Sequence, residues 1–169
     1  MNNIVVKNIV RFLLLVLVQV FILNKLNLFG YLSPFVYVLF ILLLPFRTNK
    51  LLLLVLAFLI GLTIDVFGDT PGLHASATVL MAFIRPSVIS VFFGRIEFTQ
   101  KEAPDIKKLG FIGFGKYAFV LVMVHHFSLY FMEALSFSRF FDTLKTTFLS
   151  TLLSMVLIYI IVFLFSRKK

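Results

Sequence analysis

The sequence predicts an all-α integral membrane protein that crosses the bilayer six times and keeps both termini in the cytoplasm. Of its 169 residues, 61% are hydrophobic and 23 are Phe, whereas a soluble domain is close to half apolar. The apolar residues form blocks that approach or reach the roughly 20 residues needed to cross a hydrocarbon core. A spanning segment must pair its backbone groups internally and no strand-like alternation is visible, so we expect each block to be helical.

Six apolar blocks separated by polar breaks define the expected spans, all within a single membrane domain, 1–169. The first block lacks a small-residue cleavage site and is followed by similar blocks, so we interpret it as a retained helix rather than a signal peptide. The second block is short and opens with Pro34, which suits a first helical turn because its missing N–H would be unpaired there. The expected spans are 8–23, 33–46, 51–67, 74–93, 117–132 and 147–165, with a polar cytoplasmic loop at 94–116.

The distribution of positive charge predicts the orientation. With the N-terminus inside, most bases flank the cytoplasmic ends of the spans, as the positive-inside rule requires. These bases are Lys7, Arg11, Arg47, Lys50, Arg95, Lys101, Lys107, Lys108, Lys116, Arg167, Lys168 and Lys169, against Lys25, Arg139 and Lys145 outside. The loop 94–116 is interpreted as a solvated connector, with docking to a cytoplasmic partner or anionic headgroups as the alternative. Because the bases flank helices, we do not expect nucleic-acid binding.

The stretch from Gly61 to Pro86, GLTIDVFGDTPGLHASATVLMAFIRP, contains a turn and the most deeply embedded acid and base. Asp65 is expected near the outer boundary, within reach of water, where it either accepts hydrogen bonds from the turn and the next span or contacts a partner. Arg85 is expected near the midplane, beside a Pro86 that interrupts helical hydrogen bonding. Three partners remain open for Arg85: the carbonyls freed by Pro86, an acid such as Asp65, or a polar cleft.

The histidine pattern does not predict a metal site. His125 and His126 are adjacent, and neighbouring helical residues diverge by about 100°, so they cannot chelate one metal from one turn. We expect interhelical hydrogen bonds instead. The candidate partners are Ser128, Tyr130 and Gln19.

Catalysis requires a nucleophile with a base, or an acid–base pair, within hydrogen-bond reach. The sequence has no motif of this kind and no Cys. His74 is expected at the outer surface, where a dyad with Asp69 is conceivable, but GLHASA is explained more simply as a turn and the first turn of the fourth span. We therefore predict that the protein is not an enzyme and uses no cofactor or metal.

The span pattern and the stretch across the third and fourth spans resemble the rod shape-determining protein MreD family. The residues that carry the resemblance are Gly61, Asp65, Gly72, His74, Ala75, Arg85 and Pro86. The resemblance implies a multi-pass component of the bacterial cytoplasmic (inner) membrane with a compact bundle similar to the S components of energy-coupling-factor transporters. It also implies a role in cell shape: binding to a bitopic MreC-like protein and, through it, association with the MreB filament and the peptidoglycan synthases RodA and penicillin-binding protein 2.

Two functions follow as hypotheses. The first is a scaffold that packs the partner's transmembrane helix, with the hairpin around Asp65 and Gly72 shaping the contact. Small residues mark the expected faces: Gly61, Ala75, Ser76 and Ala77. The second is an S-component-like transporter subunit that captures a small ligand, which predicts an outward-facing pocket with convergent polar groups. The sequence leaves open whether two copies associate.

Overall fold

The computed structural model describes residues 2–26, 32–94, 102–135 and 140–166, and helices dominate all four ranges. Within these residues, five helices are long and apolar enough to span a membrane: α1 (Asn2–Phe21), α3 (Lys50–Gly68), α4 (Leu73–Phe93), α5 (Ile106–Ala134) and α6 (Phe140–Ser166). Two short elements, η1 (Leu23–Lys25) and α2 (Leu39–Leu42), lie between α1 and α3. The all-α, multi-pass character expected from composition is confirmed.

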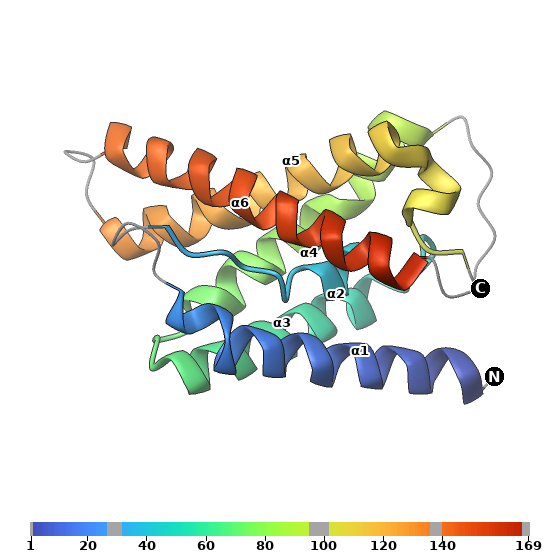
Figure 1. The fold of residues 1–169 in the computed structure, drawn as a ribbon, viewed down its shortest axis with the longest axis horizontal. Helices are drawn as coiled ribbons and strands as arrows, with labels where there is room; N and C mark the ends of the chain where they lie inside the picture. Colours follow the sequence, from blue (N-terminus) through green and yellow to red (C-terminus); the bar gives the residue numbers. More distant parts are fainter. Residues whose placement is uncertain (1, 27–31, 95–101, 136–139, 167–169) are drawn as a thin grey trace.

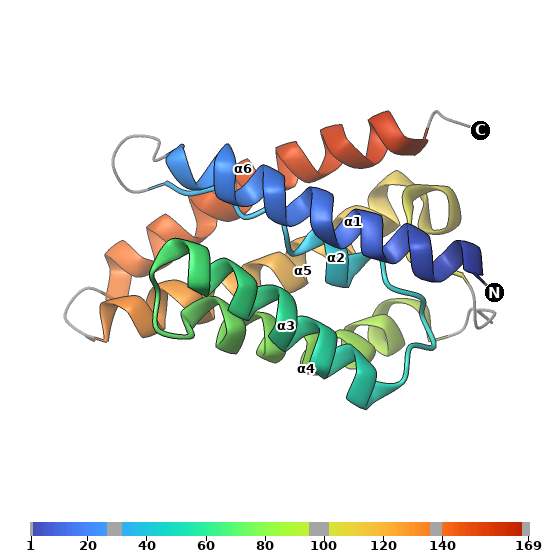
Figure 2. The same ribbon diagram turned by 90° about the horizontal axis from the view of Figure 1, so that it is seen from below.

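The five long helices lie side by side along the long axis of the molecule (Figures 1 and 2). The start of α1 and the end of α6 lie at the same end of the bundle, here called the terminal end. The opposite, distal end carries η1, the α3–α4 turn, the end of α5 and the start of α6. Consecutive helices from α3 to α6 pack against each other, and α1 packs on α3.

The second expected span is not a helix. Residues 32–46, here called the crossing segment, contain a single helical turn, α2, and are otherwise irregular or extended. The segment nevertheless runs from the distal to the terminal end, antiparallel to α1 (Figure 1). Side-chain contacts agree, since Gln19 bonds Pro34 at one end and Arg11 bonds Leu43 at the other. The prediction of a second transmembrane helix at 33–46 is therefore wrong, although the segment still crosses the bundle.

Two physical reasons explain the crossing segment. A helix over 33–46 would be about 21 Å long at roughly 1.5 Å per residue, shorter than a hydrocarbon core of roughly 30 Å. A partly extended chain covers the missing distance because it rises by roughly 3.3 Å per residue. Non-helical backbone is tolerated at membrane depth only where protein buries it, and every residue from Pro34 to Leu42 is buried.

The outward face of α1 supports a membrane location. Ile9, Leu13, Leu17 and Phe21 recur every four residues, and each side chain is at least half exposed, at 54%, 54%, 50% and 60%. Residues four apart lie on one helix face, so these side chains form a continuous apolar stripe. A stripe of this kind suits contact with lipid or with another membrane helix.

Three helix starts differ from expectation, the first because α1 begins at Asn2 rather than at residue 8. The expected loop 94–116 is partly helical, because α5 begins at Ile106 and the Asp105 carboxylate caps it by accepting a bond from the Lys108 N–H at 2.9 Å. Gly110, with φ 71°, interrupts the helical conformation shortly after this start. Part of that loop, 95–101, lies outside the described residues. The last helix also begins earlier than residue 147, at Phe140.

Helices α3 and α4 approach most closely at Gly61. A Cβ atom at this position would lie 2.5 Å from Ala75 Cα and 2.7 Å from His74 O, closer than backbone atoms can accommodate. Gly61, Ala75 and Ala77 are all buried in the fold. The small-residue face expected to meet a partner is therefore used inside the protein, and of the four marked residues only Ser76 is exposed.

We expect Gly61→Ala to lower the free energy of unfolding by about 1–3 kcal/mol, the usual cost of overpacking, because α3 and α4 must separate. Thermal unfolding in detergent, followed by far-UV circular dichroism, measures the change. Gly68→Ala is the matched control, since its nearest atom, Thr70 Oγ1, is 3.6 Å from the added Cβ. Equal stability of the two variants would contradict the close approach at Gly61.

Candidate functional site

Buried polar side chains from the long helices hold the backbone of the crossing segment. Gln19, on α1, is fully buried. Its Oε1 accepts bonds from the N–H groups of Val36 at 2.8 Å and Tyr37 at 3.4 Å, and its Nε2 donates to Pro34 O at 3.1 Å. One side chain thus supplies both donor and acceptor to a backbone that has no helical partners there.

Arg85 anchors the terminal-end part of the same segment. Its guanidinium donates to Leu44 O and, at 3.4 Å, to Pro45 O, while its Nε donates to the Tyr117 hydroxyl at 2.8 Å. Tyr117 in turn donates to Leu42 O at 3.0 Å. Arg85 is 1% exposed, so hydrogen bonds to backbone carbonyls and one phenol replace the hydrogen bonds that this α4 side chain would make to water.

None of the three partners left open for Arg85 is the one observed. Arg85 does not face a polar cleft, since it is 1% exposed, and it does not pair with Asp65, because the two side chains have different partners. The carbonyls that Arg85 binds belong to the crossing segment rather than to the turn of α4 that Pro86 leaves without a donor. Helix α4 also continues through Pro86 to Phe93, so the expected interruption at this depth does not break the helix.

Asp65 caps the start of α4. Its Oδ1 accepts bonds from Thr70 Oγ1 at 2.5 Å and from the His74 N–H at 3.0 Å, and its Oδ2 accepts from the Ala75 N–H at 2.8 Å. A carboxylate is favoured there because the first N–H groups of a helix lack internal partners and carry partial positive charge. The structural interpretation of Asp65 is confirmed, but its position within reach of water is wrong, since it is 2% exposed.

The turn that places this cap uses two left-handed residues. Asp69 has φ 54° and ends α3, and Gly72 has φ 79° and immediately precedes α4. Gly72 O then accepts bonds from the N–H and the hydroxyl of Ser76. Glycine tolerates a positive φ without steric cost, which explains the residue at position 72 without a ligand or partner.

We expect Asp65→Asn to lower the free energy of unfolding by about 1–2 kcal/mol, because an amide leaves at least one of the three donors without an acceptor. Asp69→Asn is the control: it removes a charge from the same turn, and Asn tolerates the left-handed conformation. Thermal unfolding in detergent compares the two. An Asp65→Asn variant as stable as Asp69→Asn would show that the cap contributes little.

The Tyr37 hydroxyl is the centre of a second buried cluster. It lies 3.1 Å from His74 Nδ1, 3.1 Å from Thr78 Oγ1 and 2.7 Å from His125 Nε2. The expected position of His74 at the outer surface, beside Asp69, is wrong: His74 is 8% exposed and its ring faces Tyr37. The cluster joins the crossing segment to α4 and α5.

His126 bonds across to α6, as expected of a histidine in this span, but through a different residue. Its Nε2 lies 3.0 Å from Ser154 Oγ and its Nδ1 lies 2.9 Å from Val122 O. Ser154 Oγ also accepts a bond from the Phe35 N–H at 3.0 Å. None of the three candidate partners bonds either histidine ring among the described residues: Ser128 donates to the His125 carbonyl, Tyr130 to Ser150, and Gln19 to the crossing segment.

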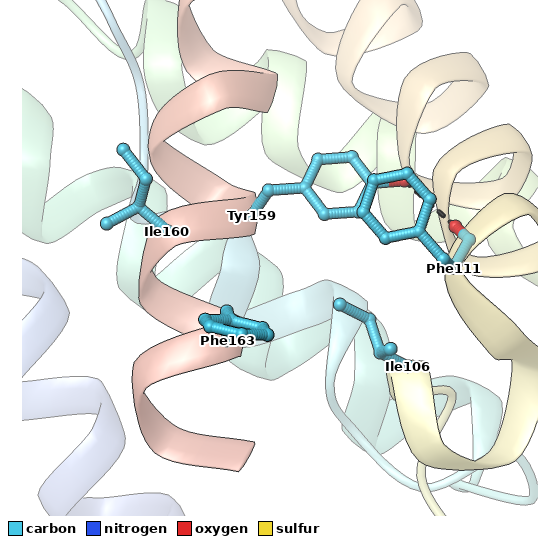
Figure 3. A pocket seen from close by; sticks show the side chains of 5 residues that line it. All are labelled: Ile106, Phe111, Tyr159, Ile160 and Phe163. Atoms are coloured by element: carbon cyan, nitrogen blue, oxygen red, sulfur yellow. Dashed lines mark hydrogen bonds between the residues drawn. The ribbon is translucent and has the colours of Figure 1, made fainter. Parts of the chain in front are cut away.

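At least two cavities lie in the described part of the protein. The smaller, about 240 Å³, is at the terminal end between α5 and α6, and its lining is apolar apart from one hydroxyl: Ile106, Phe111, Tyr159, Ile160 and Phe163 (Figure 3). The Tyr159 hydroxyl already donates to Phe111 O at 2.9 Å, and the two rings stack at 4.5 Å. This cavity therefore offers a ligand little except apolar contact.

The larger cavity, about 700 Å³, is at the distal end, where five long helices and the crossing segment contribute to its wall. It is here called the distal cavity. Its polar lining residues are Asn24, Lys25, Ser33, Thr70, His74, Tyr130, Glu133 and Thr146, and its apolar ones are Val20, Phe35, Phe67, Gly68, Leu73 and Leu129. Within the described ranges, no group of three or more His, Asp or Glu side chains is arranged to hold a metal ion.

Sequence reasoning identified Asp65 and Arg85 but missed Tyr37 and Tyr117, the two hydroxyls on which the network depends. Tyr37 lies in the apolar run VYVLF, and Tyr117 opens the apolar run YAFV. A buried tyrosine hydroxyl needs a hydrogen-bond partner, so two tyrosines inside predicted spans were a usable signal. Comparisons with known proteins add nothing further, because no family model, curated protein or solved structure matches the chain.

Proposed function

We propose that the protein is a non-enzymatic scaffold of the bacterial inner membrane that packs the single transmembrane helix of an MreC-like partner. In this role it belongs to the cell-elongation machinery and supports lateral peptidoglycan synthesis, with indirect links to the MreB filament, RodA and penicillin-binding protein 2. One observation carries the proposal. The polar side chains of the stretch that resembles the MreD family are engaged in intramolecular bonds, as Asp65, His74 and Arg85 illustrate.

Apolar helix faces therefore remain as the main surface for recognition. We place the partner on the stripe of α1, because α1 has the smallest share of buried residues among the five long helices. In its apolar stretch 17% of the residues are buried, against 33–39% in the others. Helix association in lipid depends on close van der Waals packing. The proposal also orients the terminal end toward the cytoplasm, since the starts of α1, α3 and α5 lie there (Figure 1) and carry the exposed bases Lys7, Lys50 and Lys107.

Co-purification of a tagged MreC-like protein from membranes tests the scaffold. The double variant Leu13→Ala and Leu17→Ala shortens the α1 stripe, and we expect it to reduce recovery of the partner. The matched control is Val156→Ala with Ile160→Ala, which shortens two exposed side chains of α6, at 58% and 50% exposure. Undiminished recovery with the α1 variant would remove this face from the interface, and no recovery with the unmodified chain would reject the scaffold.

A second candidate function is favoured by the distal cavity. An S-component-like subunit captures a small ligand at the outer side, and the cavity, at about 700 Å³, has the size and mixed lining of such a site. Under this proposal the bundle also shares the S-component fold. Native mass spectrometry of gently purified protein is the test: a stoichiometric bound molecule supports ligand capture, and a bare chain under conditions that preserve the fold contradicts it.

A further inference from the structure

We propose that the distal cavity binds a zwitterionic group, one that carries an ammonium next to a phosphate or carboxylate. The inference rests on the second candidate function, ligand capture, and names the chemistry of the ligand. A phosphoethanolamine headgroup and a free zwitterionic solute share this chemistry. Several groups that line the cavity still have a hydrogen-bond donor or acceptor available.

The hydrogen bonds of the Tyr37 cluster determine which ring nitrogen of His74 carries the hydrogen. Thr78 donates its only hydroxyl hydrogen to His74 O at 2.6 Å, so towards Tyr37 it acts as an acceptor. Tyr37 therefore donates to Thr78 and must accept from both imidazoles, which places the hydrogens on His74 Nδ1 and His125 Nε2. The lone pair of the neutral His74 ring is then on Nε2.

That lone pair is available to a ligand. His74 lines the distal cavity, and among the described residues its Nε2 has no hydrogen-bond partner. The same hydrogen bonds leave His125 Nδ1 without a hydrogen. This nitrogen is fully buried and also has no partner among the described residues. Of the two lone pairs, only that of His74 belongs to a residue of the cavity wall.

Two further acceptors accompany His74. Thr70 uses its hydroxyl hydrogen on Asp65 Oδ1 at 2.5 Å, so its oxygen is left as an acceptor. Glu133, near the end of α5, adds an exposed carboxylate. The walls contributed by the α3–α4 turn and by α5 thus present acceptors, one of them charged, which suits an ammonium that donates several hydrogen bonds.

The wall contributed by η1 presents donors. Asn24 uses its Oδ1 to accept from Gln19 Nε2 at 2.9 Å, so its Nδ2 hydrogens remain to be donated. A Cβ at Gly68 would lie 4.0 Å from this Nδ2, which places the amide across from a cavity-lining glycine. Lys25, the next residue, is exposed and adds a positive charge. This wall suits the phosphate or carboxylate of the ligand.

The charge balance favours a ligand with both signs. Lys25 and Glu133 are the formally charged residues of the described lining, so the cavity has no net charge. A ligand with only negative charge would be repelled by the Glu133 carboxylate, and a ligand with only positive charge would be repelled by the Lys25 ammonium. A zwitterion satisfies both walls at once, while Phe35 and Phe67 contact its apolar part.

Binding to the full-length protein in nanodiscs tests the proposal. Isothermal titration calorimetry with O-phosphoethanolamine measures binding of a free solute. Native mass spectrometry after exposure to phosphatidylethanolamine detects binding of a lipid headgroup. Phosphatidylcholine, whose ammonium cannot donate hydrogen bonds, and phosphatidylglycerol, which has no ammonium, are the comparison lipids. We expect binding of the first or second probe in preference to both comparison lipids, and the arm that binds identifies the source.

Variants assign the binding to the cavity. Lys25→Gln and Glu133→Gln are each expected to weaken binding by about tenfold or more, as loss of a charge-assisted hydrogen bond does. Lys145→Gln and Asp142→Asn remove exposed charges of α6 at the same end, outside the cavity lining, and are expected to leave binding unchanged. A captured molecule without an ammonium would overturn the zwitterion and leave ligand capture standing. Failure of every probe, with a bare chain in native mass spectra, would overturn both.

Discussion

Replacing Arg85 by leucine is expected to lower the free energy of unfolding by about 3–5 kcal/mol, the largest effect of any single substitution considered. The change removes the donors of Leu44 O and Pro45 O and the Nε–H donor of the Tyr117 hydroxyl, and of these bonds only the one to Pro45 O is not fully buried. A buried polar group that loses its partner costs about 1–3 kcal/mol, more when the lost partner is charged. Denaturant or thermal unfolding in detergent, followed by far-UV circular dichroism, measures the loss.

Two further variants give this result its meaning. Arg85→Lys keeps the charge but lacks the planar fork that reaches the carbonyls and Tyr117 together, so we expect an intermediate loss. Arg47→Leu removes an exposed base at the terminal end and is expected to change stability by less than about 0.5 kcal/mol. An Arg85→Leu variant as stable as Arg47→Leu would mean that the carbonyls of the crossing segment do not depend on Arg85.

Replacing Gln19 by methionine is expected to cost about 2–4 kcal/mol. Methionine has a similar length and shape but leaves Pro34 O and the Val36 N–H without their side-chain partner in a fully buried site. The effect is also local: amide hydrogen exchange of residues 35–38 is expected to accelerate relative to that of α4 and α5. Leu17→Ala, on the exposed stripe of the same helix, is the control. Unchanged exchange at residues 35–38 would contradict the role of Gln19.

Sequence reasoning located the five long helices and the crossing segment, but not the conformation of that segment. Hydropathy indicates whether a segment is buried but not its backbone conformation. The run from Val36 to Leu42 is as apolar as a transmembrane helix. Its conformation depends on hydrogen-bond partners from Gln19, Tyr117 and Ser154, on three different helices. A periodicity argument treats each segment alone, so it has no access to partners of this kind.

The candidate site shows the same division between local and distant contacts. The cap by Asp65 was predictable because its acceptors meet N–H groups only nine and ten residues later, across one turn. The partners of Arg85 were not, because Leu44 lies 41 residues away on a segment with an unexpected conformation. The buried position of His74 was missed for the same reason, since it depends on Tyr37, which is 37 residues distant.

The most direct test of the account is the sidedness of the two ends of the crossing segment. The chain has no Cys, so Lys25→Cys and Arg47→Cys, both at exposed positions, are single labelling sites in intact cells. With a membrane-impermeant maleimide, we predict that Lys25→Cys reacts from outside, whereas Arg47→Cys reacts only after the membrane is permeabilised. Reaction of both positions from the same side would mean that residues 32–46 do not cross the membrane, and would contradict the account.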